Sequence, residues 1–118
     1  MTDYREGIAH DEQARRRYLQ PLADAFVIHA RIEDAAVEQT GGGVLCAEGT
    51  MPNGWRVDAD EFGWSFSDPD GSTVAMGGWY EGEEDAYRRL PADGDVLDAD
   101  EADAAARVLL TAYEAVQA

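Results

Sequence analysis

Three turn signals divide residues 44–80 into short segments, and this division constrains the fold more than any other feature of the chain. Pro52-Asn53-Gly54 and Asp68-Pro69-Asp70-Gly71 have the residues of tight turns, because proline fixes φ and glycine accepts a positive φ. Asp58-Ala59-Asp60-Glu61 is a third, since aspartate side chains bond nearby backbone N–H groups. The segments between the turns predict an antiparallel meander of four strands at residues 44–48, 55–58, 62–67 and 72–80. The third has aromatic residues at every second position, as in a half-buried strand: Phe62, Trp64 and Phe66.

The C-terminal part of the chain predicts a long helix over residues 98–116. Asp98 and Glu101 resemble a capping box, and acidic residues in the first turn suit the helix dipole. The helix would bury a narrow apolar stripe: Ala102, Ala105, Ala106, Leu109, Tyr113 and Val116. A shorter helix is expected over residues 83–90, stopped by Pro91.

The first forty residues also have a helical pattern. Apolar positions recur at steps of three and four residues: Ala14, Tyr18, Leu22, Ala25, Phe26, His29, Ile32 and Ala36. Asp11 is the expected N-cap, and Pro21 either starts a second helix or kinks a continuous one. Residues 25–32 leave a strand open as an alternative, because they are rich in residues that favour strands.

These elements predict one domain over residues 1–118 of class α+β, an antiparallel four-stranded β-meander with N-terminal and C-terminal helices packed on one face. The chain is 45% hydrophobic, which is enough for a core and too much for an acidic disordered tail. No apolar run approaches membrane-spanning length, and residues 1–17 lack the apolar core of a signal peptide. We therefore expect a cytoplasmic protein.

Charge is the most unusual property of the composition. The chain has 25 acidic residues against 9 basic ones, for a net charge of −16, and all nine basic residues are arginine. Such a chain repels nucleic acid and anionic membranes, so we expect direct binding to neither, and it attracts basic proteins. Acidity also keeps proteins of salt-loving organisms soluble, so the net charge alone does not require a partner.

The acids are concentrated near the C-terminal helix. Residues 81–118 hold eleven acids and three arginines, net −8, and ten of those acids lie between Glu81 and Asp103. An aromatic pair beside clustered carboxylates fits an interface for a basic protein, although the simpler alternative, that both rings end a core strand, fits better. The predicted partner-binding residues are Trp79, Tyr80, Glu81, Glu83, Glu84, Asp85, Asp100 and Asp103.

Catalytic and metal-binding motifs are not evident. Cys46 is expected to be a buried small hydrophobe, since Arg56 is the only basic residue between 32 and 87 that could activate its thiol. Residues 93–101 resemble part of an EF-hand loop but lack its sixth-position glycine, which favours an acidic loop and N-cap instead. His29 is expected in the core. We predict a non-enzymatic protein with no catalytic residue, metal or cofactor.

The leading hypothesis is an acidic inhibitor whose negative face blocks a basic surface of a partner, one that normally binds nucleic acid. The chain is similar, in size and charge only, to small acidic phage inhibitors of the anti-CRISPR and antirestriction kind, which act as DNA mimics. Carboxylates along a helix could replace duplex phosphates, which occur about every 1.7 Å along the axis.

Two alternatives also fit this composition. One is an immunity or antitoxin-type protein that neutralises a basic toxin. The other is a small soluble domain from a halophile or a GC-rich bacterium, whose charge serves solubility. The single basic cluster, Arg15-Arg16-Arg17, is expected to pair internally or with a second subunit, which allows a homodimer.

Overall fold

The structure, a computed structural model, describes residues 4–39, 45–80 and 88–117, with side chains of the first helix from Glu12 onward. Two long helices, α1 (Tyr4–His29) and α2 (Ala99–Gln117), are the first and the last element of the chain. Five strands lie between them: β1 (Ala36–Gln39), β2 (Leu45–Thr50), β3 (Arg56–Ala59), β4 (Gly63–Ser67) and β5 (Thr73–Gly78). Two short strands precede α2: β6 (Ala92–Asp93) and β7 (Val96–Leu97).

The main sheet is an antiparallel meander in the order β1-β2-β3-β4-β5, which confirms the α+β class. The predicted number of strands, four, is wrong, because residues 36–39 form a fifth strand. Val37 pairs with Ala47 in the register of β1 and β2, and its side chain is buried. Four residues are too few to show a period-two pattern, and Ala36 also continues the helical spacing of α1, so the sequence pattern favoured a helix there.

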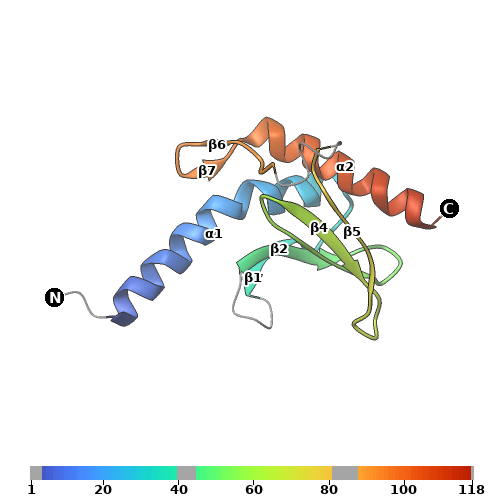
Figure 1. The fold of residues 1–118 in the computed structure, drawn as a ribbon, viewed down its shortest axis with the longest axis horizontal. Coiled ribbons are helices and arrows are strands. Elements are labelled where there is room, and N and C mark those ends of the chain that lie inside the picture. The colour runs from blue at the N-terminus through green and yellow to red at the C-terminus, as the bar shows by residue number, and fades with distance from the viewer. Residues whose placement is uncertain (1–3, 40–44, 81–87, 118) are drawn as a thin grey trace.

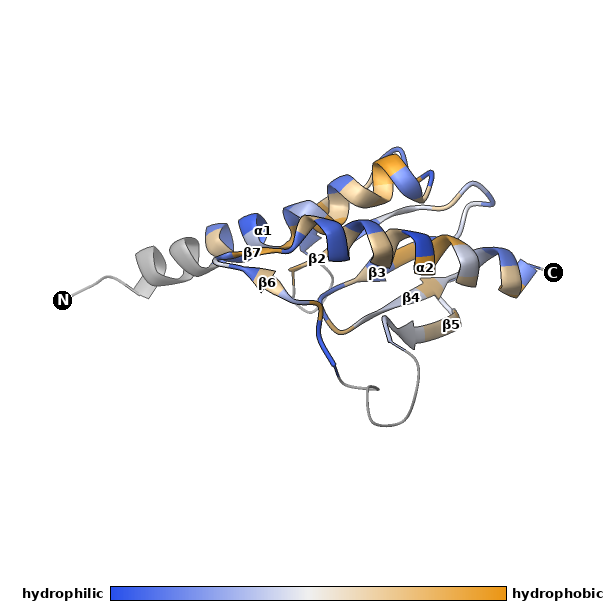
Figure 2. Cartoon of the chain, turned by 90° about the horizontal axis from the view of Figure 1, so that it is seen from above, coloured by the Kyte–Doolittle hydropathy of each residue, from blue (hydrophilic) through white to orange (hydrophobic). Residues whose placement is uncertain are grey.

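Both helices cover one face of this sheet (Figure 1). Alternate residues of the strands point to that face and pack with the helices in one core. Phe66 of β4 and Val57 of β3 are fully buried in it, as are Phe26 of α1 and Leu109 of α2. In the view from above (Figure 2), the helices lie over the strands, and hydrophilic turns in blue alternate with apolar segments along α2. The predicted packing of helices on one face is therefore present.

Helix α1 differs in its limits from the predicted helix. It begins at Tyr4, so Asp11 lies inside it and is not its N-cap. Pro21 also lies inside one continuous helix, and no second helix begins there. The strand alternative for residues 25–32 is wrong up to His29, where the helix ends. Arg31 follows with φ of 61°, a left-handed conformation that reverses the chain toward β1.

Helix α2 confirms the predicted N-terminus. The Asp98 carboxylate accepts a hydrogen bond from the Glu101 backbone N–H at 3.1 Å, as an N-cap does. The predicted polar loop before it contains the β6–β7 hairpin, with Gly94 in its turn at φ of 68°. The predicted helix over 83–90 lies mostly outside the described residues, and Arg88 to Leu90 are not helical.

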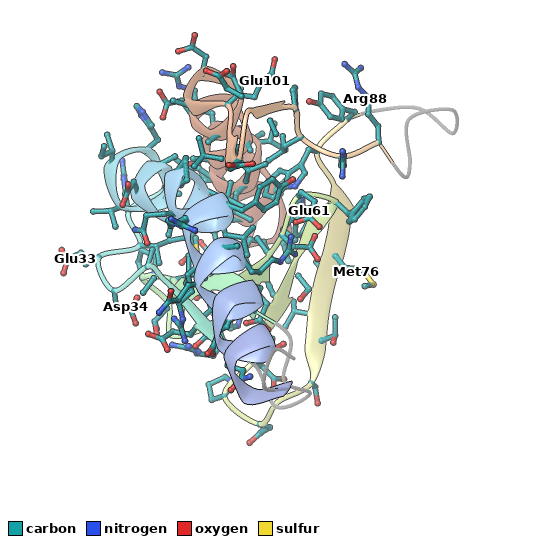
Figure 3. The ribbon with its side chains drawn as sticks, turned by 90° about the vertical axis from the view of Figure 1, so that its left-hand side faces the viewer. Glu33, Asp34, Glu61, Met76, Arg88 and Glu101 are labelled. Carbon is teal, nitrogen blue, oxygen red and sulfur yellow. The ribbon has the colours of Figure 1, made fainter. Side chains whose placement is uncertain are left out.

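Strand β5 is an edge of the sheet and has little side-chain cover. Gly63 and Gly77 bring it very close to β4, where a Cβ on Gly77 would come within 2.8 Å of the Trp64 ring. On the face away from the helices, Met76 is 73% exposed, and Val74 is 38% exposed. Figure 3 shows Met76 pointing outward from this strand.

Candidate functional site

The predicted interface begins at Trp79, and the structure places this side chain in the core. Trp79 is only 6% exposed, its ring packs 6.3 Å from that of Phe26, and its indole N–H donates to the Asp60 carbonyl oxygen at 2.8 Å. A ring held on all sides cannot anchor a partner without unfolding. Trp79 directly follows β5, and its ring belongs to the core, so the burial favours a core residue over the predicted contact residue.

Tyr80 lies at the base of the helix that carries the other predicted contacts. Its hydroxyl donates to a Glu101 carboxylate oxygen at 3.3 Å, in the first turns of α2. The Arg88 guanidinium stacks over the same ring, 4.2 Å from its centroid. Tyr80 and Arg88 flank residues 81–87, so the two described residues next to this acidic segment contact each other, and Tyr80 connects them to Glu101.

The remaining predicted contacts divide into two groups. Asp100 is exposed in the first turn of α2, and Asp103, one turn later, pairs with His29 at 3.4 Å. This pair joins the end of α1 to α2 and gives Asp103 a structural contact. Glu81, Glu83, Glu84 and Asp85 lie outside the described residues.

A second group of polar residues lies on the sheet face that the helices leave open. Cys46, Glu48 and Asp58 each offer a ligand atom within 4.8 Å of the other two, from the paired strands β2 and β3. A thiolate and two carboxylates are donors that a divalent metal such as zinc accepts. Glu48 is already engaged, because the Arg56 guanidinium contacts it at 3.1 Å. The sequence analysis did not bring these three residues together, since only the register of β2 and β3 does so.

Electrostatics on this open face disfavour negative charge. Burial, with the nearby charges of Asp58 and Glu48, raises the pKa of the Cys46 thiol to about 12. Burial also raises the pKa of Glu48, against the opposing effect of Arg56. The thiol therefore stays protonated at neutral pH, in agreement with the prediction that Cys46 is buried and lacks an electropositive setting.

A cavity of about 540 Å³ opens between α1, the β3–β4 turn and the β6–β7 hairpin. Three arginines line it, an unexpected concentration of cations in so acidic a chain: Arg15, Arg17 and Arg89. The other lining residues are Ala14, Tyr18, Glu61, Gly94 and Asp95. The predicted internal pairing of the arginine cluster is met by two members, since Arg15 contacts Glu61 at 2.8 Å and Arg16 contacts Glu12 at 3.5 Å.

Glu61 forms the inner wall of this cavity and is 7% exposed (Figure 3). Its Oε1 accepts a hydrogen bond from Arg15, but its buried Oε2 accepts none within the described part of the chain, although Arg15 lies close enough for an ion pair. Burial and the charge of Glu61 raise the pKa of Tyr18 in the same cavity. Sequence reasoning assigned Glu61 only to a turn, and nothing in the local pattern indicates that α1 and a distant hairpin meet there.

Comparisons with protein-family models, with curated proteins and with solved structures found no match to this chain. Neither described helix contains a segment long and apolar enough to cross a membrane.

Proposed function

We propose that this protein is a non-enzymatic acidic binding protein that blocks a basic, normally nucleic-acid-binding, surface of a partner protein. Its contact surface is the acidic end of the molecule, defined here as the first turns of α2, the β6–β7 hairpin and the segment that Tyr80 and Arg88 flank. Trp79 is not part of this surface.

The observation that supports the proposal is the meeting of Tyr80, Arg88 and Glu101. The hydrogen bond of 3.3 Å and the stacking distance of 4.2 Å bring both described ends of the segment beside the start of α2. Asp100 is exposed on α2, and Asp93 and Asp95 are exposed on the adjoining hairpin. Exposed carboxylates of α2 and of the hairpin thus lie near the two described residues that flank the acidic residues 81–87, which supports a local negative field over an even coat.

Binding to a basic partner would depend on this field in two ways. Clustered carboxylates accelerate encounter with a positive surface, and their effect weakens when salt screens the charges. If the carboxylates replace nucleic-acid phosphates, the nucleic acid and this protein must also compete for the same surface of the partner.

A pull-down from host lysate tests the proposal. The immobilised protein is expected to retain a nucleic-acid-binding protein at about 0.15 M sodium chloride and to release it as the Debye length falls toward about 3 Å at 1 M. Added duplex DNA or RNA should displace the captured protein. The triple variant Glu83→Arg, Asp85→Arg, Asp100→Arg should abolish capture while leaving the unfolding transition in place.

A matched variant separates the position of the charge from its amount. Asp24→Arg, Glu33→Arg and Asp70→Arg change the net charge equally, at exposed residues of α1, the α1–β1 connection and the β4–β5 turn. This variant should retain the captured protein. Undiminished capture by the first triple variant, or equal loss in both, would show that the acidic end is not the contact surface.

A further inference from the structure

We propose that the arginine-lined cavity binds the phosphate group of a small phosphorylated molecule, held between Arg17 and Arg89. The site shares the β6–β7 hairpin with the acidic end, but its arginines lie outside that surface, and the inference does not rest on the function proposed for it. A cavity of about 540 Å³ lies within the size range of small-molecule sites, about 300–1,000 Å³.

Available cations are the first argument for this ligand. Arg15 is occupied by Glu61, whereas Arg17 and Arg89 make no ion pair or hydrogen bond with the described residues, and both are exposed. They approach the cavity from separate elements, α1 and the segment before β6. Guanidinium groups are planar forks of N–H donors that match phosphate oxygens, and two of them on different walls can hold one phosphate from two sides.

The charge balance of the lining is the second argument. Three guanidiniums face two carboxylates, Glu61 and Asp95, so the cavity carries one excess positive charge in a protein of net charge −16. Repulsion by distant carboxylates is largely screened beyond about 8 Å at physiological salt, whereas a phosphate in the cavity would contact its arginines directly. The excess positive charge of the lining therefore favours an anion in the cavity.

Glu61 supplies an independent indication that the cavity is a ligand site. The two oxygens of a carboxylate have about four lone-pair sites, so a buried carboxylate paired with a single arginine can still accept a further hydrogen bond. Oε2 lies 2.8 Å from the Arg15 guanidinium in an ion pair, accepts no well-aligned hydrogen bond from the described residues, and belongs to a side chain that lines the cavity. A ligand that carries a hydroxyl or amine donor beside its phosphate would satisfy this oxygen, as sugar phosphates and nucleoside monophosphates do.

Calorimetric titration of the whole protein with inorganic phosphate and with adenosine monophosphate tests the site. Both probes should bind and compete with each other, and adenosine, which lacks the phosphate, should not bind. The double variant Arg17→Ala, Arg89→Ala should weaken both phosphates at least tenfold. The double variant Arg31→Ala, Arg107→Ala changes the net charge equally at exposed residues away from the cavity, and it should bind as the unmodified protein does.

A loss of phosphate binding in the arginine variants could result from unfolding, so the test includes a variant that should bind phosphate more tightly. Glu61→Gln removes a negative charge from the cavity and releases Arg15 from its ion pair, so inorganic phosphate should bind several-fold more tightly. The proposal would be overturned if this variant bound inorganic phosphate no more tightly than the unmodified protein. It would also be overturned if both arginine double variants lost affinity equally, or if neither inorganic phosphate nor adenosine monophosphate bound at ligand concentrations on the order of 10 mM. Binding of a short single-stranded oligonucleotide with higher affinity than adenosine monophosphate would also overturn it, because the phosphate source would then be a nucleic acid.

Discussion

At the residue scale, position within the fold decides what each unusual side chain can do. Trp79 and Cys46 are both chemically versatile residues, yet one is enclosed against Phe26 and the other is buried beside two carboxylates. Glu61 shows the opposite case, because an ordinary turn residue becomes the buried wall of a cavity. From residue type alone, Trp79 and Cys46 would be better candidates for a functional site than Glu61, whereas the structure favours Glu61.

The raised pKa of Cys46 predicts a thiol that is inert in the folded protein. With a pKa of about 12, its thiolate fraction at pH 8 is far below that of an unfolded cysteine, whose pKa is about 8.5. Reaction with a disulfide reagent should be at least 100-fold slower in buffer than in denaturing urea, as absorbance of the released thiolate measures. Asp58→Asn removes a nearby negative charge and should accelerate the reaction in the folded state. Equal rates in buffer and in urea would contradict the buried, protonated thiol.

The raised pKa of Cys46 also predicts that the folded state loses stability at alkaline pH. The folded pKa of Cys46 lies above the unfolded value, so the folded state keeps a proton that the unfolded chain loses. The contribution of this group to stability is therefore fully present below about pH 8.5 and is lost as the pH rises toward 12. Tyr18, whose pKa is also raised, contributes with the same sign at higher pH.

At the scale of elements, the sequence predicted the long, strongly patterned segments and missed the short ones. The turns around β3, β4 and β5 and the capped start of α2 follow from local chemistry, such as Asp68, which accepts hydrogen bonds from Asp70 and Ser72 N–H groups at 3.0 Å. Strand β1 and the β6–β7 hairpin have two to four residues per strand, too few for a period to show. Their strand structure depends on pairing partners, which the local pattern does not reveal.

The close approach of β4 and β5 predicts a sharp difference between two glycines. A Cβ on Gly63 would overlap the Gly77 carbonyl oxygen and lie 3.3 Å from the Gly78 Cα, and backbone atoms of a sheet cannot easily move. Gly63→Ala should cost about 1–3 kcal/mol of unfolding free energy or more, as overpacking does. Gly71 has open space around it and only a positive φ of 89°, so Gly71→Ala should cost about 1 kcal/mol. Urea unfolding of both variants checks the order, and a larger loss at Gly71 would be inconsistent with the β4–β5 packing.

At the scale of the whole molecule, the charge could be counted from the sequence, but its arrangement could not. Sequence order separates Arg17, Glu61 and Arg89 by more than seventy residues, and the cavity that they share exists only after α1 packs beside the turn and the hairpin. Likewise, nothing local links Tyr80 to Glu101. Each candidate site lies between several helices and strands, and the sequence pattern within one element does not show which other elements it contacts.

Repulsion among the carboxylates predicts a characteristic dependence of stability on salt. The radius of gyration is 14.6 Å, so at about 0.01 M salt, with a Debye length of about 30 Å, the carboxylates in excess over the arginines repel one another across much of the fold. At about 0.15 M the Debye length is about 8 Å, and most of this repulsion is removed. The melting temperature, followed by circular dichroism, should rise by several degrees over this interval and then level off. A fold that forms only in molar salt would instead favour adaptation to a saline cytoplasm.

The exposed edge strand β5 makes self-association of the protein depend on its net charge. Strand β5 has no charged residue, and it exposes Val74 and Met76 next to unpaired backbone groups of an edge strand. Repulsion between molecules that each carry a net charge of −16 opposes contact between two such edges. Near the isoelectric point, about pH 4.1, that repulsion disappears while the sheet edge remains. Acidification would then allow the β5 edges of two molecules to pair, and precipitation or fibre growth would be the visible result.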